Sequence, residues 1–423
     1  MKTMKNTIKI ILILIAGIIL VLNPVQVNFT QAETQGKSIT VLFTHDTHDN
    51  LLPFKTLKDG KIENIGGFAR LMTVINKQKK IDPEAVLVDG GDFSMGTPFQ
   101  TIFASHAPEL RILGAMGYDA VTFGNHEYDY RPKGLADSLR TAVASGDKLP
   151  AILQANVTFP VDKNGEMSAE LRELKQAMEE YGVKDYTVIE RKGIKIGIFG
   201  IMGMESASMA PMSGVVFTDP VENAKRVVKV LKEQEKVDLI ICLSHSGTKV
   251  KKSESEDEIL AKKDPEIDII VSGHTHTRLD EPIVVGNTII GSVEDYGRYL
   301  GVINITQDGK GRWKLDKYEL LPIIESFEED RIIADLIEEF KEKVQQEYFD
   351  MYDLGYDEVI AYAPFQFPTN DEISRVHADS TLGNIIGDAY IYAVKKAEGE
   401  DYEPVTAAVV PTGTVRSTIF QGE

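Results

Sequence analysis

Six of the eight histidines in this chain fall in four short segments, three of which also hold aspartate, asparagine, serine or glutamate. These segments are Thr-His-Asp-Thr-His at 44–48, Gly-Asn-His-Glu at 124–127, Ser-His-Ser-Gly at 244–247 and Gly-His-Thr-His at 273–276. A fifth segment, Asp-Gly-Gly-Asp at 89–92, adds carboxylates without a histidine. Carboxylate, imidazole and amide oxygen are ligands of hard to borderline divalent ions, and no thiolate accompanies them here. The residue types therefore indicate a metal site.

Each of these five segments follows a short apolar run that predicts a β-strand buried on both faces. The runs cover 39–43, 85–88, 120–123, 239–243 and 267–271, and a sixth lies at 195–199. Amphipathic patterns predict helices between them at 67–78, 108–116 and 221–234. Because the carboxyl ends of strands in α/β proteins gather ligands at one edge, we expect the five loops to converge.

The candidate ligands are too many for one ion. They are Asp46, His48, Asp92, Asn125, His245, His274 and His276. Sharing one carboxylate would give four ligands to each of two ions, and two ions about 3.5–4 Å apart form the clamp used for in-line phosphoryl displacement. The i, i+2 spacing of Asp46 and His48, repeated by His274 and His276, predicts that each pair lies on one side of an extended segment.

Taken singly, each segment also has an ordinary explanation as an incidental Asp-x-His, a turn or a polar loop. Their occurrence in order, each after an apolar strand, favours the metal site. The remaining histidines lie outside this pattern: His45 would point away from Asp46 in an extended chain, which predicts a supporting or packing role, while His106 and His377 are expected at the surface.

In this order the motifs resemble those of the calcineurin-like metallophosphoesterases, and more narrowly the exported 5′-nucleotidase, UDP-sugar hydrolase and 2′,3′-cyclic nucleotide phosphodiesterase family. The resemblance implies an α/β (α+β) fold, a four-layer αββα sandwich of two mixed sheets flanked by helices. It also implies two divalent ions that share Asp92. One would be held by Asp46, His48, Asp92 and His276, and the other by Asp92, Asn125, His245 and His274. The sequence leaves open whether the ions are Mn, Zn, Co or Mg.

The family places a catalytic pair at the positions of His126 and Asp129. Next to Asn125, the His126 imidazole can reach a phosphoryl group without binding metal, and Asp129 could hold one ring nitrogen and favour the imidazolium form. A hydroxide generated by the ions would attack phosphorus, and His126 would stabilise the developing charge or protonate the leaving oxygen. The alternative role of Asp129 is a helix or turn cap.

Asn156 and Arg416 match family positions near the substrate, and Arg375 lies about one residue out of register with another family arginine. Strand-end packing explains Asn156 equally well. Pro411 and Thr412 stand where the family has Asn and Gly before the arginine, and loss of a glycine constrains the approach of the backbone. The family's base-stacking aromatic residues come from further along its C-terminal domain, so we expect this sequence to be a fragment of a longer chain.

Four segments are predicted along the chain. They are a signal peptide at 1–32, a metallophosphoesterase domain at 38–325, a linker helix at 326–354 and the start of a smaller C-terminal α/β domain at 355–423. The first domain should end in consecutive strands over 288–305 and 313–321. In the last segment, strands are predicted at 359–363 and 405–410 around a helix at 380–397. This segment is small for an independent core, so the domain is expected to be truncated.

The N-terminal residues indicate export. Lys2, Lys5 and Lys9 precede an apolar run over 10–22, and small residues suit cleavage after Ala32. A retained anchor is the alternative, but the run is shorter than the roughly 20 residues that span a bilayer. We therefore expect a bacterial envelope or extracellular protein with no stable membrane span after cleavage.

The amino-acid composition limits the classes of molecule that this protein is expected to bind. With 46 basic and 65 acidic residues, the net charge is −19, which disfavours binding to nucleic acid and leaves a bound cation as a local positive charge for an anionic substrate. The single cysteine, Cys242, excludes an intrachain disulfide. It lies in an apolar run, where a buried side chain is expected.

These features predict an exported dinuclear-metal phosphohydrolase acting on a small-molecule phosphoester, most simply a 5′-nucleotidase. A 2′,3′-cyclic nucleotide phosphodiesterase or a UDP-sugar hydrolase is the alternative enzyme. A non-catalytic surface binding protein on the same fold is the alternative of another class. Every ligand and catalytic position is filled, which favours turnover. The oligomeric state is not determined by the sequence.

Overall fold

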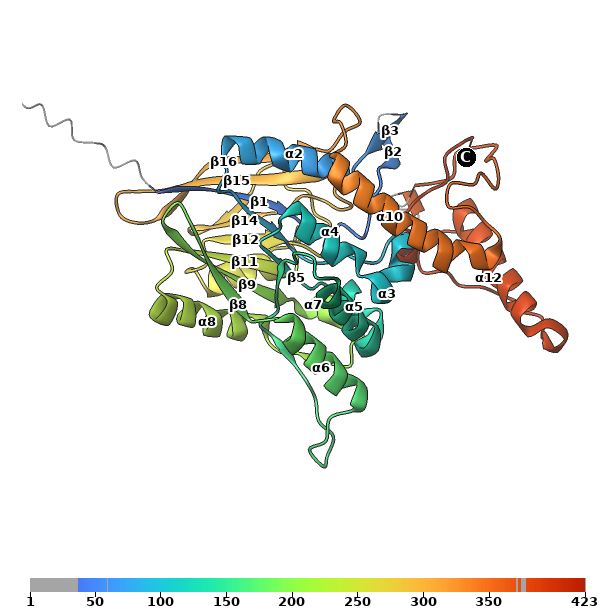
Figure 1. Cartoon of the computed structure of the whole chain (residues 1–423), viewed down its shortest axis with the longest axis horizontal. Helices are drawn as coiled ribbons and strands as arrows, with labels where there is room; N and C mark the ends of the chain where they lie inside the picture. Colours follow the sequence, from blue (N-terminus) through green and yellow to red (C-terminus); the bar gives the residue numbers. More distant parts are fainter. Residues whose placement is uncertain (1–36, 59, 370–371, 374–377, 423) are drawn as a thin grey trace, which may run out of the picture. The chain divides into compact units, whose positions relative to one another are not determined.

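The computed structural model describes residues 37–58, 60–369, 372–373 and 378–422. The predicted signal peptide at 1–32, Arg375 and His377 lie outside the described residues. Two six-stranded sheets form the centre of the part that is described (Figure 1). Each sheet mixes parallel and antiparallel strand pairs, as the family resemblance implied.

The first sheet has the strand order β16-β15-β1-β4-β5-β6. Its strands are β1 (Ser38–Thr44), β4 (Val86–Asp89), β5 (Ala120–Thr122), β6 (Ala151–Leu153), β15 (Tyr299–Gln307) and β16 (Trp313–Pro322). Strands β1, β4, β5 and β6 pair in parallel, whereas β15 and β16 pair antiparallel to their neighbours. The first three predicted strands are therefore adjacent, and their carboxyl ends lie at the same edge.

The second sheet has the order β13-β14-β12-β11-β9-β8. Its strands are β8 (Tyr186–Arg191), β9 (Ile194–Met202), β11 (Leu239–His245), β12 (Ile269–Ser272), β13 (Ile283–Val285) and β14 (Thr288–Gly291). Strands β9, β11, β12 and β14 are parallel, and β8 and β13 are antiparallel edge strands. The consecutive strands predicted after residue 288 are β14, β15 and β16, of which the last two belong to the first sheet.

Side chains that alternate along the strands explain why the sheets stack. In β1, Val41 and Phe43 pack between the two sheets, whereas Leu42 packs on the outer face. In β11, Ile241 faces the first sheet and Cys242 lies in the outer cluster. Three hydrophobic clusters thus separate four layers, helix on sheet on sheet on helix. The predicted sandwich is confirmed, and Cys242 is buried as expected.

Most of the helices bury one face against a sheet. The longer ones are α2 (Phe68–Ile81), α4 (Pro108–Met116), α5 (Arg131–Ser145), α6 (Ala169–Tyr181), α8 (Pro220–Val230), α9 (Glu256–Lys263), α10 (Arg331–Glu347) and α12 (Thr381–Glu398). Short helices are α3 (Phe103–His106) and α7 (Met204–Ser208). Side chains of α2, α4, α5, α6 and α10 join the outer cluster of the first sheet, and those of α8 and α9 join that of the second.

The smaller elements lie at the ends and edges of the sheets. They are the hairpin β2 (Phe54–Lys58) and β3 (Lys61–Ile65), the pair β7 (Val157–Thr158) and β10 (Val216–Phe217), the 3₁₀ turns η1 (Pro98–Ile102), η2 (His126–Tyr128), η4 (Phe349–Tyr352), η5 (Gly399–Asp401) and η6 (Thr412–Thr414), and the π turn η3 (Leu231–Glu235). The hairpin and β7–β10 form two-stranded sheets of their own. None of these short elements was predicted, because each offers too few residues for a periodic pattern.

Helix α10 forms in the stretch rich in glutamate and lysine for which a linker helix was predicted. The Asp330 carboxylate caps it by accepting the backbone N–H groups of Ile332 and Ile333. Its buried positions recur every three or four residues, at Ile333, Ile337, Phe340 and Val344. These side chains belong to the outer cluster of the first sheet, so α10 completes the helical layer over that sheet.

The two strands predicted at 359–363 and 405–410 are absent from the structure, although all of these residues are described. The prediction is wrong because a strand needs a neighbour that accepts its backbone hydrogen bonds, and no described strand pairs with either segment. The helix predicted between them is present as α12, capped by the Ser380 hydroxyl. A small cluster of Ala363, Phe367, Ile373 and Leu382 holds this part of the chain together.

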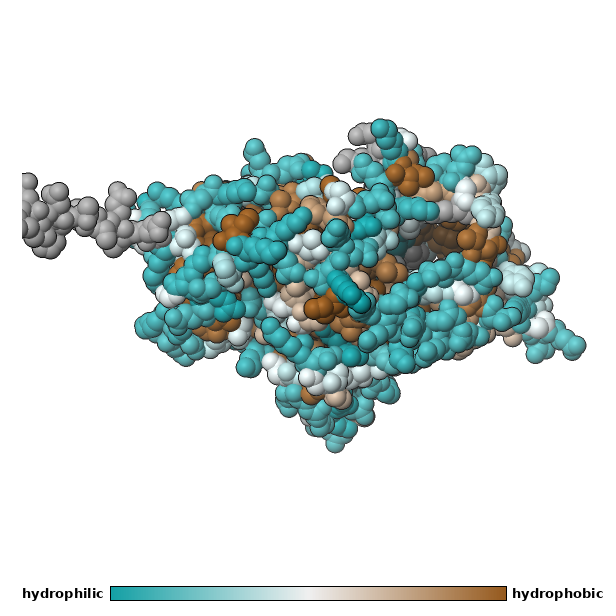
Figure 2. Space-filling view, turned by 45° about the horizontal axis from the view of Figure 1, so that its top comes forward, coloured by the Kyte–Doolittle hydropathy of each residue, from teal (hydrophilic) through white to brown (hydrophobic). Residues whose placement is uncertain are grey.

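Hydrophilic residues cover most of the molecular face drawn in Figure 2, in keeping with the high charged content. Within the described ranges, no helix combines the length and the apolar content that crossing a bilayer requires.

Candidate metal centre

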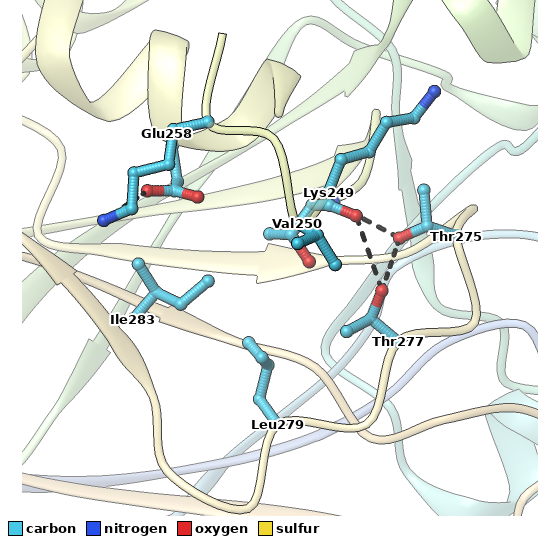
Figure 3. A pocket seen from close by; sticks show the side chains of 9 residues that line it. Lys249, Val250, Glu258, Thr275, Thr277, Leu279 and Ile283 are labelled. Atoms are coloured by element: carbon cyan, nitrogen blue, oxygen red, sulfur yellow. Dashed lines mark hydrogen bonds and ion pairs between the residues drawn. The ribbon is translucent and has the colours of Figure 1, made fainter. Parts of the chain in front are cut away.

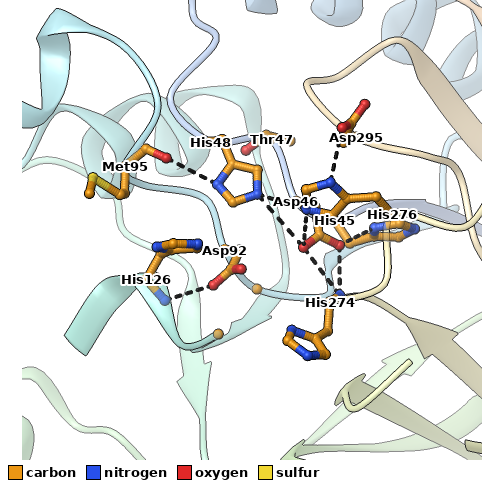
Figure 4. A network of polar contacts seen from close by, with 12 residues as sticks. His45, Asp46, Thr47, His48, Asp92, Met95, His126, His274, His276 and Asp295 are labelled. Carbon is orange, nitrogen blue, oxygen red and sulfur yellow. Dashed lines mark hydrogen bonds and ion pairs between the residues drawn. The ribbon is translucent and has the colours of Figure 1, made fainter. Parts of the chain in front are cut away.

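Six of the seven candidate ligands form one cluster at the carboxyl ends of the strands (Figure 4). The side chains form three groups, and within each group one nitrogen or oxygen atom of every residue lies within 4.8 Å of those of the others. The groups are Asp46, His48 and His276; His48, Asp92 and His126; and Asp92, His245 and His274. Because neighbouring groups share His48 or Asp92, they are continuous. The convergence predicted from the strand order is therefore present in the structure.

The distances within the cluster are short. His48 Nε2 lies 3.0 Å from His276 Nε2, and His276 Nε2 lies 3.4 Å from Asp46 Oδ1. At the other end of the cluster, His245 Nε2 lies 3.0 Å from Asp92 Oδ2. All of these side chains except His276 are nearly or fully enclosed by protein.

The seventh candidate, Asn125, lies in the loop after β5 that packs against Asp92. The backbone N–H of His126 donates to Asp92 Oδ1 at 2.9 Å. A side chain at Gly124 would place its Cβ 2.1 Å from the same oxygen, so this close approach requires glycine. The Asn125 Oδ1 atom is buried and has no hydrogen-bond partner. The structure thus places Asn125 beside Asp92 with a free oxygen.

The ligand-bearing loops are not extended, which corrects the geometry expected from the i, i+2 spacing. Asp46 and His48 have φ values of 49° and 46°, and His274 and His276 have φ values of 75° and 49°. Left-handed conformations cost non-glycine residues roughly 1–2 kcal/mol each. The strained 46–49 loop is held by hydrogen bonds of Asp46 N and His48 N to the carbonyls of Gly91 and Asp92 at 2.8 and 3.0 Å. The side chains of each pair converge because the loops turn tightly at the strand ends.

Three of the histidines are oriented by acceptors behind them. The Nδ1 atom of His48 lies 3.1 Å from Met95 O, and that of His245 lies 2.9 Å from Gly90 O. A carbonyl oxygen only accepts, so both Nδ1 atoms carry the proton and both Nε2 atoms turn toward the cluster. His276 Nδ1 is similarly 3.0 Å from the Asp295 carboxylate. Sequence analysis missed Asp295, because nothing in its local sequence sets it apart from other acidic loop residues.

The electrostatics of the cluster favour bound positive charge. Burial alone would lower the pKa of His245, but Asp92 outweighs it and raises that pKa to about 10. Burial would likewise lower the pKa of His276, but Asp46 and Asp295 outweigh it and raise that pKa to about 10. Burial lowers the pKa of His48 to about 3 and that of His274 to about 4, so these two rings are neutral. The neighbouring carboxylates therefore stabilise protons on the rings of His245 and His276, and a metal cation could take the place of these protons.

These residues fit a divalent cation on independent grounds. The buried Oδ1 of Asn125, in the loop that packs against Asp92, has no hydrogen-bond partner. A buried polar atom without a partner is costly, and a cation would satisfy it. Oxygen and imidazole donors without thiolate suit Mn²⁺, Zn²⁺, Co²⁺ or Mg²⁺.

His126 stands at the edge of the cluster with both ring nitrogens engaged. Its Nδ1 lies 2.6 Å from Asp129 Oδ2, three residues further along the chain, where η2 ends. Its Nε2 lies 2.7 Å from Nη2 of Arg416, and because guanidinium only donates, Nε2 accepts this bond. Burial lowers the pKa of His126, but the Asp129 hydrogen bond and the charge of Asp92 outweigh it, so the net shift is upward. The C-terminal segment thus places a cation beside this histidine.

The other predicted site residues lie elsewhere. Asn156 is fully buried, and its amide donates to the carbonyls of Met202 and Thr218 and accepts from Met202 N. All of its polar atoms are thus used to hold the end of β9. His106 pairs with Glu347 of α10 at 2.5 Å, at the surface as expected.

A cavity of about 550 Å³ beside the 273–277 loop is separate from the cluster (Figure 3). Thr275 and Thr277, which alternate with His274 and His276, line it together with Leu279 and Ile283. No candidate metal ligand lines the cavity.

Glu127 connects two ligand-bearing loops and was not singled out by sequence analysis. Its buried carboxylate accepts the backbone N–H groups of Gly124, Asp92 and Ser94 at 2.6, 3.2 and 3.0 Å. It also accepts the Ser94 hydroxyl at 2.9 Å. Its place directly after His126 was the available signal, but a glutamate at a turn has many ordinary uses.

The family model described as "Calcineurin-like phosphoesterase" matches residues 39–278. The matched part is more than half of the chain and contains all seven candidate ligands. The chain belongs to the calcineurin-like phosphoesterase family. The family predicted from the motifs is confirmed, and with it the expected class of metal-dependent phosphoester hydrolase.

Two individual relatives show how much of this chain is similar to known proteins. The chain is 31% identical to the trifunctional nucleotide phosphoesterase protein YfkN of Bacillus subtilis (strain 168) over 403 residues, 91% of this chain and 25% of that protein. It is 26% identical to the 5′-nucleotidase of Diplobatis ommata, covering 90% of this chain and 64% of the relative. The chain therefore spans a quarter of the first relative and under two thirds of the second.

Among solved structures, the crystal structure of a 5′-nucleotidase precursor from Thermus thermophilus superposes with a TM-score of 0.66 at 26% identity. The match covers 85% of this chain and 68% of that one. The mixed α/β sandwich is thus shared with a 5′-nucleotidase structure.

Replacement of Glu127 by glutamine should destabilise the protein. An amide presents its NH₂ group to at least one of four donors, and a buried unpaired donor costs about 1–3 kcal/mol. Urea unfolding of the metal-free protein measures this loss. Glu179→Gln on the exposed face of α6 is the matched control and should change stability by less than about 0.5 kcal/mol. Equal stabilities of the two variants would show that the Glu127 contacts contribute nothing.

Proposed function

We propose that this chain is the phosphoester-hydrolysing part of an exported two-metal nucleotidase, with 5′-nucleotidase as the activity that fits best. The observation that carries the proposal is the single buried cluster of candidate ligands with His126 at its edge. The relatives named for nucleotide phosphoesterase and 5′-nucleotidase activity support the substrate class. The predicted signal peptide and relatives named as snake venom 5′-nucleotidases support export.

Asp92 is proposed to be shared between two divalent ions. One ion would be held by Asp46, His48, Asp92 and His276, and the other by Asp92, Asn125, His245 and His274. When bound, the two ions would supply positive charge for the phosphate and acidify a water molecule.

His126 and Arg416 are proposed to act on the phosphoryl group. With Asp129 holding Nδ1, the His126 ring presents Nε2 toward Arg416 and the space beside the cluster. If Arg416 turns from the ring to the anionic group, Nε2 is free to carry a proton, and His126 would then stabilise charge on the phosphoryl oxygens or pass that proton to the leaving oxygen. Arg416 would bind the anionic group through charge-assisted hydrogen bonds, and Arg375 is retained as a weaker proposal.

Two alternatives are kept. The trifunctional name of the Bacillus relative favours a second phosphoester substrate, and 2′,3′-cyclic nucleotides or UDP-sugars remain the proposed ones. A non-catalytic binding protein on this fold is disfavoured by the filled ligand positions and the intact His126–Asp129 pair. The proposed domains remain a catalytic domain at 38–325, a connecting helix at 326–354 and a smaller C-terminal domain from 355 onward.

Chelation should abolish hydrolysis, and readdition of a divalent ion should restore it. The assay compares AMP, bis-p-nitrophenyl phosphate and a UDP-sugar before and after chelation, followed by Mn²⁺, Zn²⁺ or Co²⁺. Faster turnover of AMP supports the 5′-nucleotidase, and preference for another ester selects the alternative enzyme. Hydrolysis that survives complete metal removal would refute the two-metal proposal.

We expect the Asp92→Asn variant to lose one of the two ions, because a neutral amide has no negative charge to share between them. We expect kcat/KM for the preferred ester to fall at least about 100-fold. Metal content by mass spectrometry and steady-state kinetics measure both effects. Asp137→Asn on the surface of α5 is the control and should match the wild type. Two tightly bound ions in Asp92→Asn would contradict the shared-ligand assignment.

His126→Asn should keep the metal content and lose kcat by about 10²–10⁴-fold, the usual contribution of a positioned acid or base. Because His126 also lies within 4.8 Å of His48 and Asp92, a ligand role is the competing assignment. Metal titration distinguishes the two roles. A weakened metal affinity in this variant would make His126 a ligand and remove its proposed part in catalysis.

A further inference from the structure

His45 is enclosed between the end of β1 and the loop that follows β14. It is 1% exposed, and neither ring nitrogen reaches solvent or the ligand cluster except through Asp46. Its Nδ1 lies 2.6 Å from Asp46 Oδ2, and its Nε2 lies 2.7 Å from the backbone nitrogen of Val293. We propose that His45 is a positioning residue that controls metal binding through Asp46. The inference rests on the proposed two-metal function.

The hydrogen bonds determine which His45 nitrogen carries the proton. A backbone N–H only donates, so Nε2 accepts from Val293 and is unprotonated. The nearby Ser292 hydroxyl donates its single proton to the carbonyl oxygen of Thr277 at 2.6 Å. The His45 proton is therefore on Nδ1, and Nδ1 donates it to Asp46 Oδ2.

The bond from His45 leaves one Asp46 oxygen for the metal. Oδ2 accepts from His45 Nδ1 and, at 2.8 Å, from the backbone N–H of His274, which uses both of its lone-pair directions. The same N–H lies 3.1 Å from Oδ1, which keeps a second lone pair for an ion. Oδ1 faces Nε2 of His276 at 3.4 Å and Nε2 of His48 at 3.9 Å. Asp46 thus presents Oδ1 alone to an ion held with these two histidines.

His45 also reaches the second group of ligands. Asp46 Oδ2, fixed by His45, holds the backbone of His274, whose side chain belongs to the group with Asp92 and His245. A single buried hydrogen bond therefore orients a ligand in each group. Loss of the His45 donor should weaken both ions together, whereas loss of a ligand specific to one group should weaken chiefly that one.

The test compares His45→Leu with His45→Asn. Leucine removes the donor and keeps an apolar side chain, whereas the asparagine amide can place its N–H near the position of Nδ1. Calorimetric titration of the metal-free protein with Mn²⁺ should show both dissociation constants raised about 10–100-fold in His45→Leu. Asparagine should restore them to within about threefold of the wild type, less than the roughly tenfold loss expected for a missing supporting contact. His106→Leu, a histidine paired away from the cluster, should bind Mn²⁺ like the wild type.

Equal Mn²⁺ affinities in the wild type and His45→Leu would overturn the proposal, and so would equal losses in the leucine and asparagine variants, because packing alone would then explain them. A crystal structure of the Mn²⁺-loaded wild type gives an answer even where His45→Leu does not fold: coordination through Oδ1 supports the proposal, and coordination through both Asp46 oxygens refutes it. Failure of the wild type to bind any of Mn²⁺, Zn²⁺, Co²⁺ and Mg²⁺ would reject the proposed function as well, whereas wild-type Mn²⁺ binding with unchanged variants rejects only the role of His45.

Discussion

Concentrated negative charge, buried at one edge of two stacked sheets, is the constraint on which the rest of this structure depends. Asp46 and Asp92 are almost fully enclosed, and removing a carboxylate from water costs several kcal/mol unless positive charge lies beside it. His245 and His276 supply that charge by retaining protons, and the pKa of each is raised to about 10. The same nitrogens and oxygens are suitable ligands for divalent cations, so the feature that makes the cluster costly to bury also suits it to bind a metal.

The fold offsets this cost by holding every group from behind. Carbonyls of Met95 and Gly90, the carboxylate of Asp295 and the ring of His45 each bind the side of a ligand that faces away from the cluster. Such contacts sustain left-handed backbone conformations that a free loop would abandon. The sheets contribute by bringing the ends of β1, β4, β11 and β12 to one edge, so that chain segments far apart in the sequence supply one cluster.

The last part of the chain is connected to the site through Arg416, which lies against His126 and adds a donor for an anionic group. The chain spans a quarter to just under two thirds of the first relatives' own length, so substrate choice in those proteins is open to residues outside the matched part. In the proposed function, ions held by the cluster would bind the phosphate that the alternative phosphoesters have in common, so that one fold could serve several substrates.

Apolar runs and strand-end motifs are local patterns, and for that reason the amino-acid sequence was enough to predict most of the sandwich strands, several of its helices and the residues of the cluster. Strands β6, β8 and β13 were not predicted. The supporting contacts required the folded chain. Glu127 and Asp295 act on loops that are distant from them in the sequence. His45 acts on its neighbour Asp46 but is oriented by Val293, 248 residues further along the chain, and no local pattern identifies these contacts. The left-handed turns at Asp46 and His274 contradict the extended spacing because hydrogen bonds from other loops impose them. The strands predicted at 359–363 and 405–410 are absent because β-propensity is a local property. A strand forms only where another backbone completes its hydrogen bonds, and that depends on the tertiary structure.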